Sequence, residues 1–228
     1  CSCARQGASA TTEVHWRRMK LIGLTGAIGS GKSSVSALFE RKGAIIIDGD
    51  GIAKQLQQQG SPTLQKLVYE FGDILLDSGE LDRAKVAKLV FGDAEMLKRL
   101  NAIMHPAIGV EILRQIELNI ATDNVVVLDM PLLVENPRDG MSGLVVVDVD
   151  PEVAISRLVQ FRNMNEEDAR RRMASQASRE DRLKVADRII DNSGSPEDLG
   201  SQVDDVWDWF ATLPNAQQGA GALNQKSK

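Results

Sequence analysis

The sequence predicts an α/β fold in which a five-stranded parallel sheet lies between layers of helices. Short runs rich in valine and isoleucine alternate along the chain with helical patterns, as expected for a parallel sheet wrapped by helices. At least two of these runs are nearly continuous in apolar residues, which indicates strands buried on both faces. The five candidate strands span residues 20–25, 44–48, 124–130, 143–149 and 187–190.

Length and composition favour one globular unit and exclude several classes of protein. The 228 residues are 43% hydrophobic and 26% charged, as in ordinary globular domains. The net charge of -5 argues against a nucleic-acid binder, which usually presents a basic face. Both cysteines, Cys1 and Cys3, lie at the start of the chain and form no disulfide framework, and no apolar segment is long enough to span a membrane. We therefore expect a cytoplasmic protein, and we expect it to be a monomer.

Both ends of the chain are expected to lie outside the folded unit. Residues 1–18 lack the apolar core of a signal peptide, so we expect a leader that is disordered or foreign to the native protein, with folding from Met19. Residues 214–228 are rich in glycine, glutamine and asparagine, which predicts a disordered tail. The folded unit is then expected over residues 19–213.

The helices carry start signals, and one connection is unusually long. Asp150 and Ser195 each precede a proline and a glutamate, the pattern of a helix cap followed by proline at the first helical position. Between the second and third strands, two apolar stripes at helical spacing flank His105-Pro106, where we expect a junction of two helices. A simple crossover needs far fewer residues, so this segment predicts an additional subdomain that binds substrate.

A phosphate-binding loop follows the first strand. The segment from Gly26 to Ser33 (GAIGSGKS) matches G-x-x-x-x-G-K-[ST] and precedes a helical pattern. Glycines let successive backbone N–H groups face the phosphates, Lys32 reaches the β- and γ-phosphates, and the Ser33 hydroxyl binds Mg²⁺. The alternative is a glycine-rich turn that matches the motif by chance. It is disfavoured because a strand is expected directly before the motif and a helix directly after it. We therefore predict a P-loop NTPase fold, with ATP bound by Gly29, Ser30, Gly31, Lys32, Ser33 and Ser34.

Two acidic positions at strand ends could serve the chemistry. Asp50 follows the second strand at the sheet edge where ligands bind, and could orient an alcohol and accept its proton. The alternative is that Asp50 caps a helix that begins near Ile52. Asp129 closes the third strand and could hold Mg²⁺ through water, or form a hydrogen bond that fixes the loop at Pro131.

Other polar residues have plain structural explanations. His105 lies beside the expected helix break, where a lone histidine is more often structural than functional. Arg170, Arg171 and Arg172, followed by Arg179, form a run that usually marks a solvated helix face. In a phosphoryl-transfer enzyme, the same segment could close over the nucleotide. The residues alone favour the solvated face.

Seven segments, in order, resemble the dephospho-CoA kinase family. They cover roughly residues 19–210: GLTGAIGSGKSSV, IIDGDGIAKQL, GSPTLQKLVYEFG, GELDRAKVAKLVF, LNAIMHPAI, VVLDMPLLVE and ADRIIDNSGSPEDL. The resemblance implies a fold akin to the nucleoside monophosphate kinases, with a helical CoA-side insertion at 51–122 and a lid at about 160–180. The core is then made of residues 19–50, 123–159 and 181–213. The implied reaction uses ATP and Mg²⁺ to phosphorylate the ribose 3′-hydroxyl of dephospho-CoA, the last step of coenzyme A biosynthesis.

The resemblance also implies roles for residues that match the family's motifs. Asp50 and Lys32 are the implied catalytic residues, and Asn192 and Gly194 match the loop near the adenine of ATP. Phe161 stands where the family often has a lid arginine, so the phosphate contact could come from any of several arginines. The implied acceptor-binding residues are Asp50, Arg83, His105, Pro131 and Leu132, and the implied lid arginines are Arg162, Arg170 and Arg179.

Two other functions remain as alternatives. A P-loop kinase for another small alcohol or a nucleoside monophosphate would keep the phosphate loop, but it gives no reason for the HP, DMPLLVE and DNSG segments together. A nucleotide-binding regulator of GTPase type would need an N-K-x-D element after a late strand, and residues 148–151 read DVDP instead. ATP turnover that depends on an added acceptor would separate these possibilities.

Overall fold

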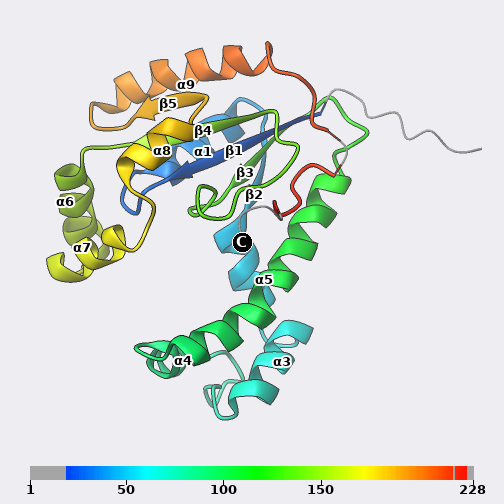
Figure 1. Cartoon of the computed structure of the whole chain (residues 1–228), viewed down its shortest axis with the longest axis vertical. Helices are drawn as coiled ribbons and strands as arrows, with labels where there is room; N and C mark the ends of the chain where they lie inside the picture. The colour runs from blue at the N-terminus through cyan, green and yellow to red at the C-terminus, as the bar shows by residue number, and fades with distance from the viewer. Residues whose placement is uncertain (1–18, 218, 225–228) are drawn as a thin grey trace, which may run out of the picture.

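The computed structural model describes residues 19–217 and 219–224. The expected leader, residues 1–18, lies outside the described residues, as do positions 218 and 225–228 of the expected tail. The predicted fold is confirmed, because five parallel strands form one sheet in the order β2-β3-β1-β4-β5 with helices on both faces (Figure 1).

Each strand lies within one or two residues of its predicted position, because β-branched runs of this kind fit a buried pleated surface. The strands are β1 (Lys20–Gly26), β2 (Ile45–Asp48), β3 (Val125–Asp129), β4 (Gly143–Asp148) and β5 (Arg188–Asp191). The helices of the described chain are α1 (Lys32–Arg41), α2 (Gly49–Leu56), α3 (Pro62–Phe71), α4 (Arg83–Val90), α5 (Ala94–Glu117), α6 (Pro151–Arg162), α7 (Glu166–Ala174), α8 (Arg179–Val185) and α9 (Pro196–Phe210).

Alternating side chains of the strands build two separate layers of core. On one face, Ile22, Leu24 and Val127 pack with Val35 and Phe39 of α1 and with the apolar side of α9. On the other face, the intervening strand residues pack against the second half of α5 and against α2. Both faces of the central strands are therefore buried, as their continuous apolar sequence requires.

The register of the sheet brings the polar strand ends together. Asp48 at the end of β2 lies opposite Asp129 at the end of β3, and Asp129 lies opposite Leu24 of β1, two residues before Gly26. Because all strands run in one direction, the P-loop and both carboxylates lie at the same carboxyl edge of the sheet.

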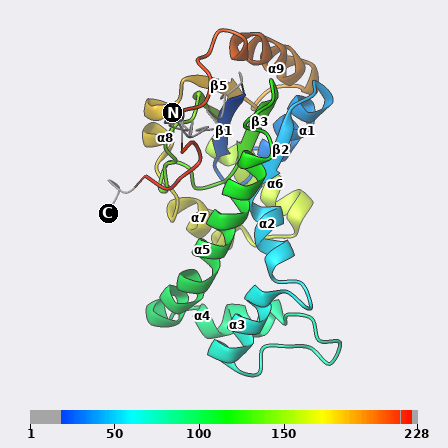
Figure 2. The ribbon, with the colours of Figure 1, turned by 90° about the vertical axis from the view of Figure 1, so that its right-hand side faces the viewer.

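Helices α3 and α4 and the first half of α5 project from the core as the outer part of a helical insertion that α2 and α5 connect to the sheet (Figures 1 and 2). Its own small core gathers Leu64, Leu67, Ile74, Leu81 and Met104. The helix break expected at His105-Pro106 is wrong: α5 runs without interruption over 24 residues, with Pro106 inside it. Proline removes one backbone hydrogen bond, but apolar packing on both sides of it holds the helix together. No helix within the described residues combines the length and apolar character that a membrane span needs.

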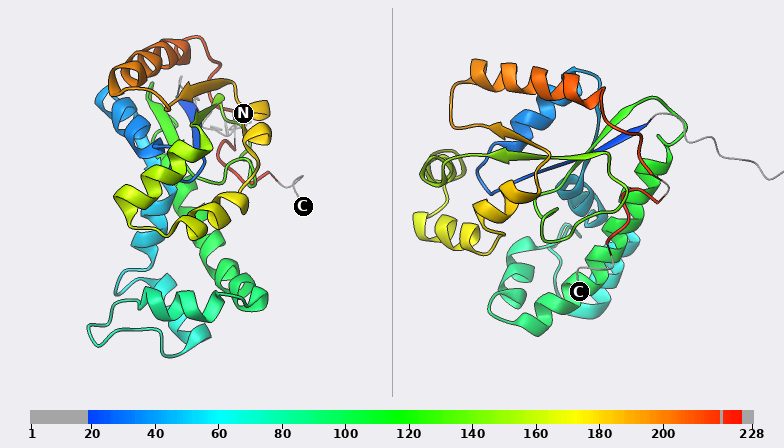
Figure 3. Two further views of the ribbon diagram at one scale, coloured as in Figure 1. Left: turned by 90° about the vertical axis from the view of Figure 1, so that its left-hand side faces the viewer. Right: turned by 45° about the horizontal axis from the view of Figure 1, so that its top comes forward.

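Helices α6 and α7 form a second small projection at the carboxyl edge of the sheet, seen from the side in Figure 3. Asp150 caps α6 through the backbone N–H groups of Glu152 and Val153, as predicted, and Asn165 caps α7. Ile155, Leu158 and Ala169 form their core, to which Ile28 of the P-loop adds a contact. The projection therefore packs directly against the phosphate loop.

The prediction of a disordered tail is wrong for the described part of residues 214–228. The backbone N–H of Ala216 donates to the carbonyl of Met19 at 2.9 Å, and the side chains of Ala216 and Ala220 are buried against the sheet layer that α5 covers. The segment is poor in large apolar residues, so composition alone predicts disorder. In the structure, the burial of two small side chains, Ala216 and Ala220, holds it against the core.

Candidate functional site

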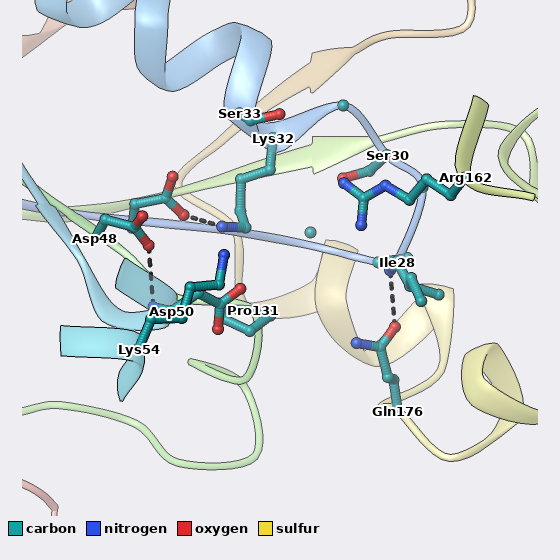
Figure 4. Close-up of a pocket in the computed structure, with 15 residues that line it drawn as sticks. Ile28, Ser30, Lys32, Ser33, Asp48, Asp50, Lys54, Pro131, Arg162 and Gln176 are labelled. Atoms are coloured by element: carbon teal, nitrogen blue, oxygen red, sulfur yellow. Dashed lines mark hydrogen bonds and ion pairs between the residues drawn. The ribbon is translucent and has the colours of Figure 1, made fainter. Parts of the chain in front are cut away.

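The P-loop lines a pocket of about 450 Å³ at the carboxyl edge of the sheet (Figure 4). The expected catalytic and metal-binding residues meet here. Lys32, Asp48, Asp50 and Lys54 lie on one side of the loop, while Arg162 and Gln176 approach from the other. The remaining lining comes from the loop itself, with Ser33, Asp129 and Pro131.

The loop conformation depends on glycine at two positions. Gly29 and Gly31 both have φ of 81°, a backbone region that favours glycine. A Cβ atom on Gly29 would lie 2.8 Å from the carbonyl oxygen of Ala154, and one on Gly31 would lie 2.1 Å from Nδ2 of Asn192. The Asn192 side chain donates to the carbonyl of Ser30 at 2.7 Å, so the segment after β5 braces the loop.

The hydroxyl of Ser30 is buried and has no hydrogen-bond partner among the described residues. A buried hydroxyl without a partner is costly, and a phosphate oxygen would satisfy it. In contrast, the backbone N–H of Ile28 is already satisfied, because it donates to Oε1 of Gln176 at 2.9 Å. Part of the hydrogen-bonding capacity of the loop is therefore available to a phosphate group.

Lys32 projects from the start of α1 and forms an ion pair with Asp129, which also accepts a hydrogen bond from Ser36. Burial lowers the pKa of Lys32 from its usual 10.5, although the carboxylates of Asp50 and Asp48 act in the opposite direction. Asp129 is 5% exposed, so its charge is compensated by Lys32 and not by solvent. The expected hydrogen bond that fixes the loop at Pro131 comes instead from Thr25, which donates to the Pro131 carbonyl at 3.1 Å.

The two acids after β2 have different surroundings. Asp48, not Asp50, is the N-cap of α2, and its Oδ1 accepts the backbone N–H of Asp50 at 3.0 Å. The alternative explanation of Asp50 as a helix cap is therefore wrong. Asp50 lies in the first turn of α2, and its exposed side chain lines the pocket that contains Lys32. Its side chain therefore borders the same space as Lys32.

Of the three expected lid arginines, only Arg162 lines the P-loop pocket. Arg170 is engaged on the surface, where it pairs with Glu152 and Glu166 at 2.8 Å each. Arg179 pairs with Asp148 at 2.6 Å. Phe161 is 79% exposed and points away from the core, so the residue after it presents the guanidinium to the pocket.

A second pocket of about 560 Å³ adjoins the first, because Gly31 lines both. It contains the three expected ATP-binding residues that the P-loop pocket lacks, Ser34, Asn192 and Gly194. The apolar side chains of Leu38 and Leu199 also line it. Together the two pockets provide a polar site for phosphates and a more apolar site on the far side of Gly31.

The expected acceptor-binding residues are less concentrated. Pro131 lines the P-loop pocket, and Arg83 lies in a neighbouring hollow that shares Lys54 with it. His105 lines a larger pocket between α5 and the turn that follows β3. Leu132 is 38% exposed and lines none of these pockets.

Sequence reasoning missed several residues of the site. Lys54 lies one helical turn after Asp50, and the i,i+4 spacing was a signal that could have found it. Arg157 approaches the P-loop from a segment more than a hundred residues away in sequence, so nothing local indicates it. Gln176 belongs to the segment that we expected could close over the nucleotide, but it was given no role of its own.

The chain is similar to dephospho-CoA kinases over most of its length. The family model described as CoaE, dephospho-CoA kinase, matches residues 20–198. A dephospho-CoA kinase from Streptomyces avermitilis is 48% identical over 191 residues, covering 83% of this chain and 93% of that protein. A dephospho-CoA kinase from Corynebacterium diphtheriae is 48% identical over 200 residues, which cover 85% of this chain and 98% of that protein.

Solved structures agree with this similarity. The crystal structure of a protein from Thermus thermophilus superposes with a TM-score of 0.72 at 30% identity, covering 85% of this chain and 98% of that chain. The dephospho-CoA kinase from Campylobacter jejuni superposes with a TM-score of 0.61 at 25% identity and the same coverage. Because the family model matches residues 20–198 and the identity to these relatives extends over nearly their whole length, this chain belongs to the dephospho-CoA kinase family.

Proposed function

We propose that the P-loop pocket performs the family's reaction through Lys32 and Asp50. In this reaction the γ-phosphoryl group of ATP passes to the ribose 3′-hydroxyl of dephospho-CoA, giving coenzyme A and ADP in the last step of coenzyme A biosynthesis. The observation that supports the assignment is the meeting of a P-loop lysine and an unengaged carboxylate, Asp50, in one pocket. A nucleotide switch has no need of the second group.

Asp50 orients the acceptor and accepts its proton. The 3′-oxygen attacks the γ-phosphorus in line while the bond from phosphorus to the β–γ bridging oxygen breaks, and the hydroxyl proton passes to the Asp50 carboxylate. Lys32 leaves Asp129 to meet the β- and γ-phosphates, and the guanidinium of Arg162 adds positive charge from the lid. Most of the rate enhancement then comes from positioning and from charge stabilisation.

The residues present fit Mg²⁺ bound together with ATP. The Ser33 hydroxyl and the Asp129 carboxylate line the pocket and would be the residues that hold the ion, and oxygen is the donor type that Mg²⁺ prefers. No group of three or more acidic, histidine or cysteine ligands gathers within the described residues. When bound, Mg²⁺ would neutralise charge on the phosphates.

The direct test is ATP consumption by the purified protein with Mg²⁺, measured with and without dephospho-CoA. We expect turnover only with the acceptor, and a product that is heavier than dephospho-CoA by one phosphoryl group in the mass spectrum. ATP binding without turnover on dephospho-CoA would contradict the acceptor assignment and leave the phosphate-loop assignment in place. A nucleoside monophosphate offered in parallel would then test the alternative acceptor class.

Replacing Arg162 by alanine is expected to lower kcat about 100-fold, because one preorganised cation is lost from the developing charge. The matched control is Arg172→Ala, which removes an exposed arginine of α7 that does not line the pocket. Steady-state kinetics at saturating ATP and dephospho-CoA measure both. Equal activity of the two variants would show that Arg162 has no part in transfer.

A further inference from the structure

The side chain of Gln176 enters the P-loop pocket from the segment that follows α7 (Figure 4). Its Oε1 accepts the backbone N–H of Ile28 at 2.9 Å, across 148 residues of sequence. Backbone N–H groups of a P-loop usually face phosphate oxygens, but this one is taken up by a side chain of the lid. Gln176 therefore joins the lid to the phosphate loop inside the pocket.

The hydrogen bond to Ile28 determines how the amide of Gln176 is turned. A carboxamide has an acceptor oxygen and a donor NH₂ group, and only the oxygen can meet a backbone N–H. Nε2 is therefore directed away from the loop backbone, and it forms no hydrogen bond within the described residues. In Figure 4 it is turned toward the part of the pocket that holds Asp50 and Pro131. The pocket thus contains an oriented donor that the described chain does not use.

The backbone around Gln176 is held on both sides. The N–H of Gln176 donates to the carbonyl of Met173 at 3.2 Å, and the N–H of Ala177 donates to Oε1 of Glu135 at 2.7 Å. The carbonyl of Ala177 also accepts a hydrogen bond from Arg182, which is 8% exposed. A side chain on a backbone fixed in this way loses little further freedom when it meets a ligand. The Gln176 amide is therefore preorganised.

A purely structural role explains only half of this amide. The side chain of Ile28 already packs against the apolar core of the lid, which contains Ile155 and Leu158, so loop and lid are in contact without Gln176. A bond to the N–H of Ile28 needs only an acceptor oxygen, which glutamate would offer as well. The donor half of the amide is explained by a ligand that accepts a hydrogen bond.

We propose that Gln176 is a further catalytic residue, whose Nε2 donates a hydrogen bond to a γ-phosphoryl oxygen of ATP while its Oε1 holds the N–H of Ile28. The proposal rests on the proposed function, because it assigns the contact to the group that is transferred. Negative charge in the transfer is spread over the three equatorial oxygens of the phosphoryl group, and an oriented donor stabilises it.

The arrangement of the two pockets supports the γ-phosphoryl group as the partner. With the base in the more apolar pocket beyond Gly31, the phosphates run along the P-loop toward Asp50. The γ-phosphoryl group is then the last of the three and lies in the pocket that Lys32 and Asp50 line. Gln176 and Arg162 line this pocket from the lid and do not line the more apolar one.

The first test is Gln176→Glu, which keeps an oxygen for the N–H of Ile28 and replaces the donor by a negative charge. We expect kcat to fall about 100-fold and the melting temperature to stay close to the wild-type value. The control is Gln160→Glu, the same change at an exposed position of α6 that does not line the pocket. Wild-type kcat in Gln176→Glu would overturn the proposal.

The second test is Gln176→Leu, which removes the oxygen and the donor together. It is expected to lower kcat to a similar extent, because neither variant can donate to the phosphoryl group. If Gln176→Leu lost activity and Gln176→Glu kept it, the bond to Ile28 would be the whole function of the side chain, and the donor assignment would be overturned.

The third test measures nucleotide binding without turnover. Calorimetric titration with Mg²⁺ and no acceptor is expected to show that Gln176→Glu weakens ATP binding at least about tenfold more than ADP binding, because ADP lacks the γ-phosphoryl group. Equal weakening of both nucleotides, or unchanged affinity for both, would overturn the assignment. Weakening confined to ATP, in a protein that does not phosphorylate dephospho-CoA, would instead contradict the proposed function and keep the contact of Gln176.

Discussion

Replacing Lys32 by alanine is expected to lower kcat about 100-fold or more and to weaken ATP binding as well. The ammonium group is the cation that the P-loop helix places beside the phosphates, and it stabilises charge in both the bound and the transferring state. The substitution also leaves Asp129 buried without its partner, which adds electrostatic repulsion toward the nucleotide. Steady-state kinetics and fluorescent-nucleotide titration measure the two effects.

Lys42→Ala is the matched control for Lys32→Ala. Lys42 stands at the other end of α1 and pairs on the surface with Asp204, so its loss removes one positive charge far from the pocket. We expect nearly wild-type kinetics for this variant. If Lys32→Ala also retained wild-type turnover, the P-loop lysine would have no role in transfer.

The substitution Asp50→Asn is expected to lower kcat about 100-fold or more while largely sparing ATP binding. The amide keeps the size and hydrogen-bonding shape of the side chain but cannot accept the hydroxyl proton. Asp50 forms no cap to α2, so the fold should not suffer from the change. A comparison of kcat with the dissociation constant for ATP separates the catalytic effect from an effect on nucleotide binding.

The neighbouring acid provides a sharp comparison for Asp50. Asp48 lines the same pocket, but its carboxylate is engaged as the cap of α2, and asparagine caps helices equally well. Asp48→Asn should therefore retain much more activity than Asp50→Asn. The reverse order of activities would move the role of base to Asp48.

The sheet and most helix starts could be predicted because their signals are local. Continuous β-branched runs are typical of strands buried on two faces, and a capping residue before proline marks the start of α6 and α9. The P-loop and the acid after β2 follow from the same kind of local pattern. Their meeting in one pocket follows from the parallel direction of the strands.

Features that depend on tertiary packing could not be predicted in this way. Pro106 indicates a break, yet contacts on both sides keep α5 continuous. Arg162 and Arg170 are equivalent in type, but Arg162 ends α6 and lines the pocket, whereas Arg170 lies within α7 and pairs with Glu152 on the surface. Residues 219–224 have the composition of a disordered tail. The surface on which they pack forms only when α5 and the segment after β3 are folded.

The insertion and the lid each have an apolar cluster of their own, separate from the two layers around the sheet. Substitutions in such separate units tend to add in their effects on stability, since they share few partners. The insertion, which we expect to bind the acceptor, can therefore accumulate changes without destabilising the sheet and the P-loop. A change of acceptor would then require changes only in a peripheral unit. The edge of the sheet, with the P-loop, Lys32 and Asp50, could stay unchanged.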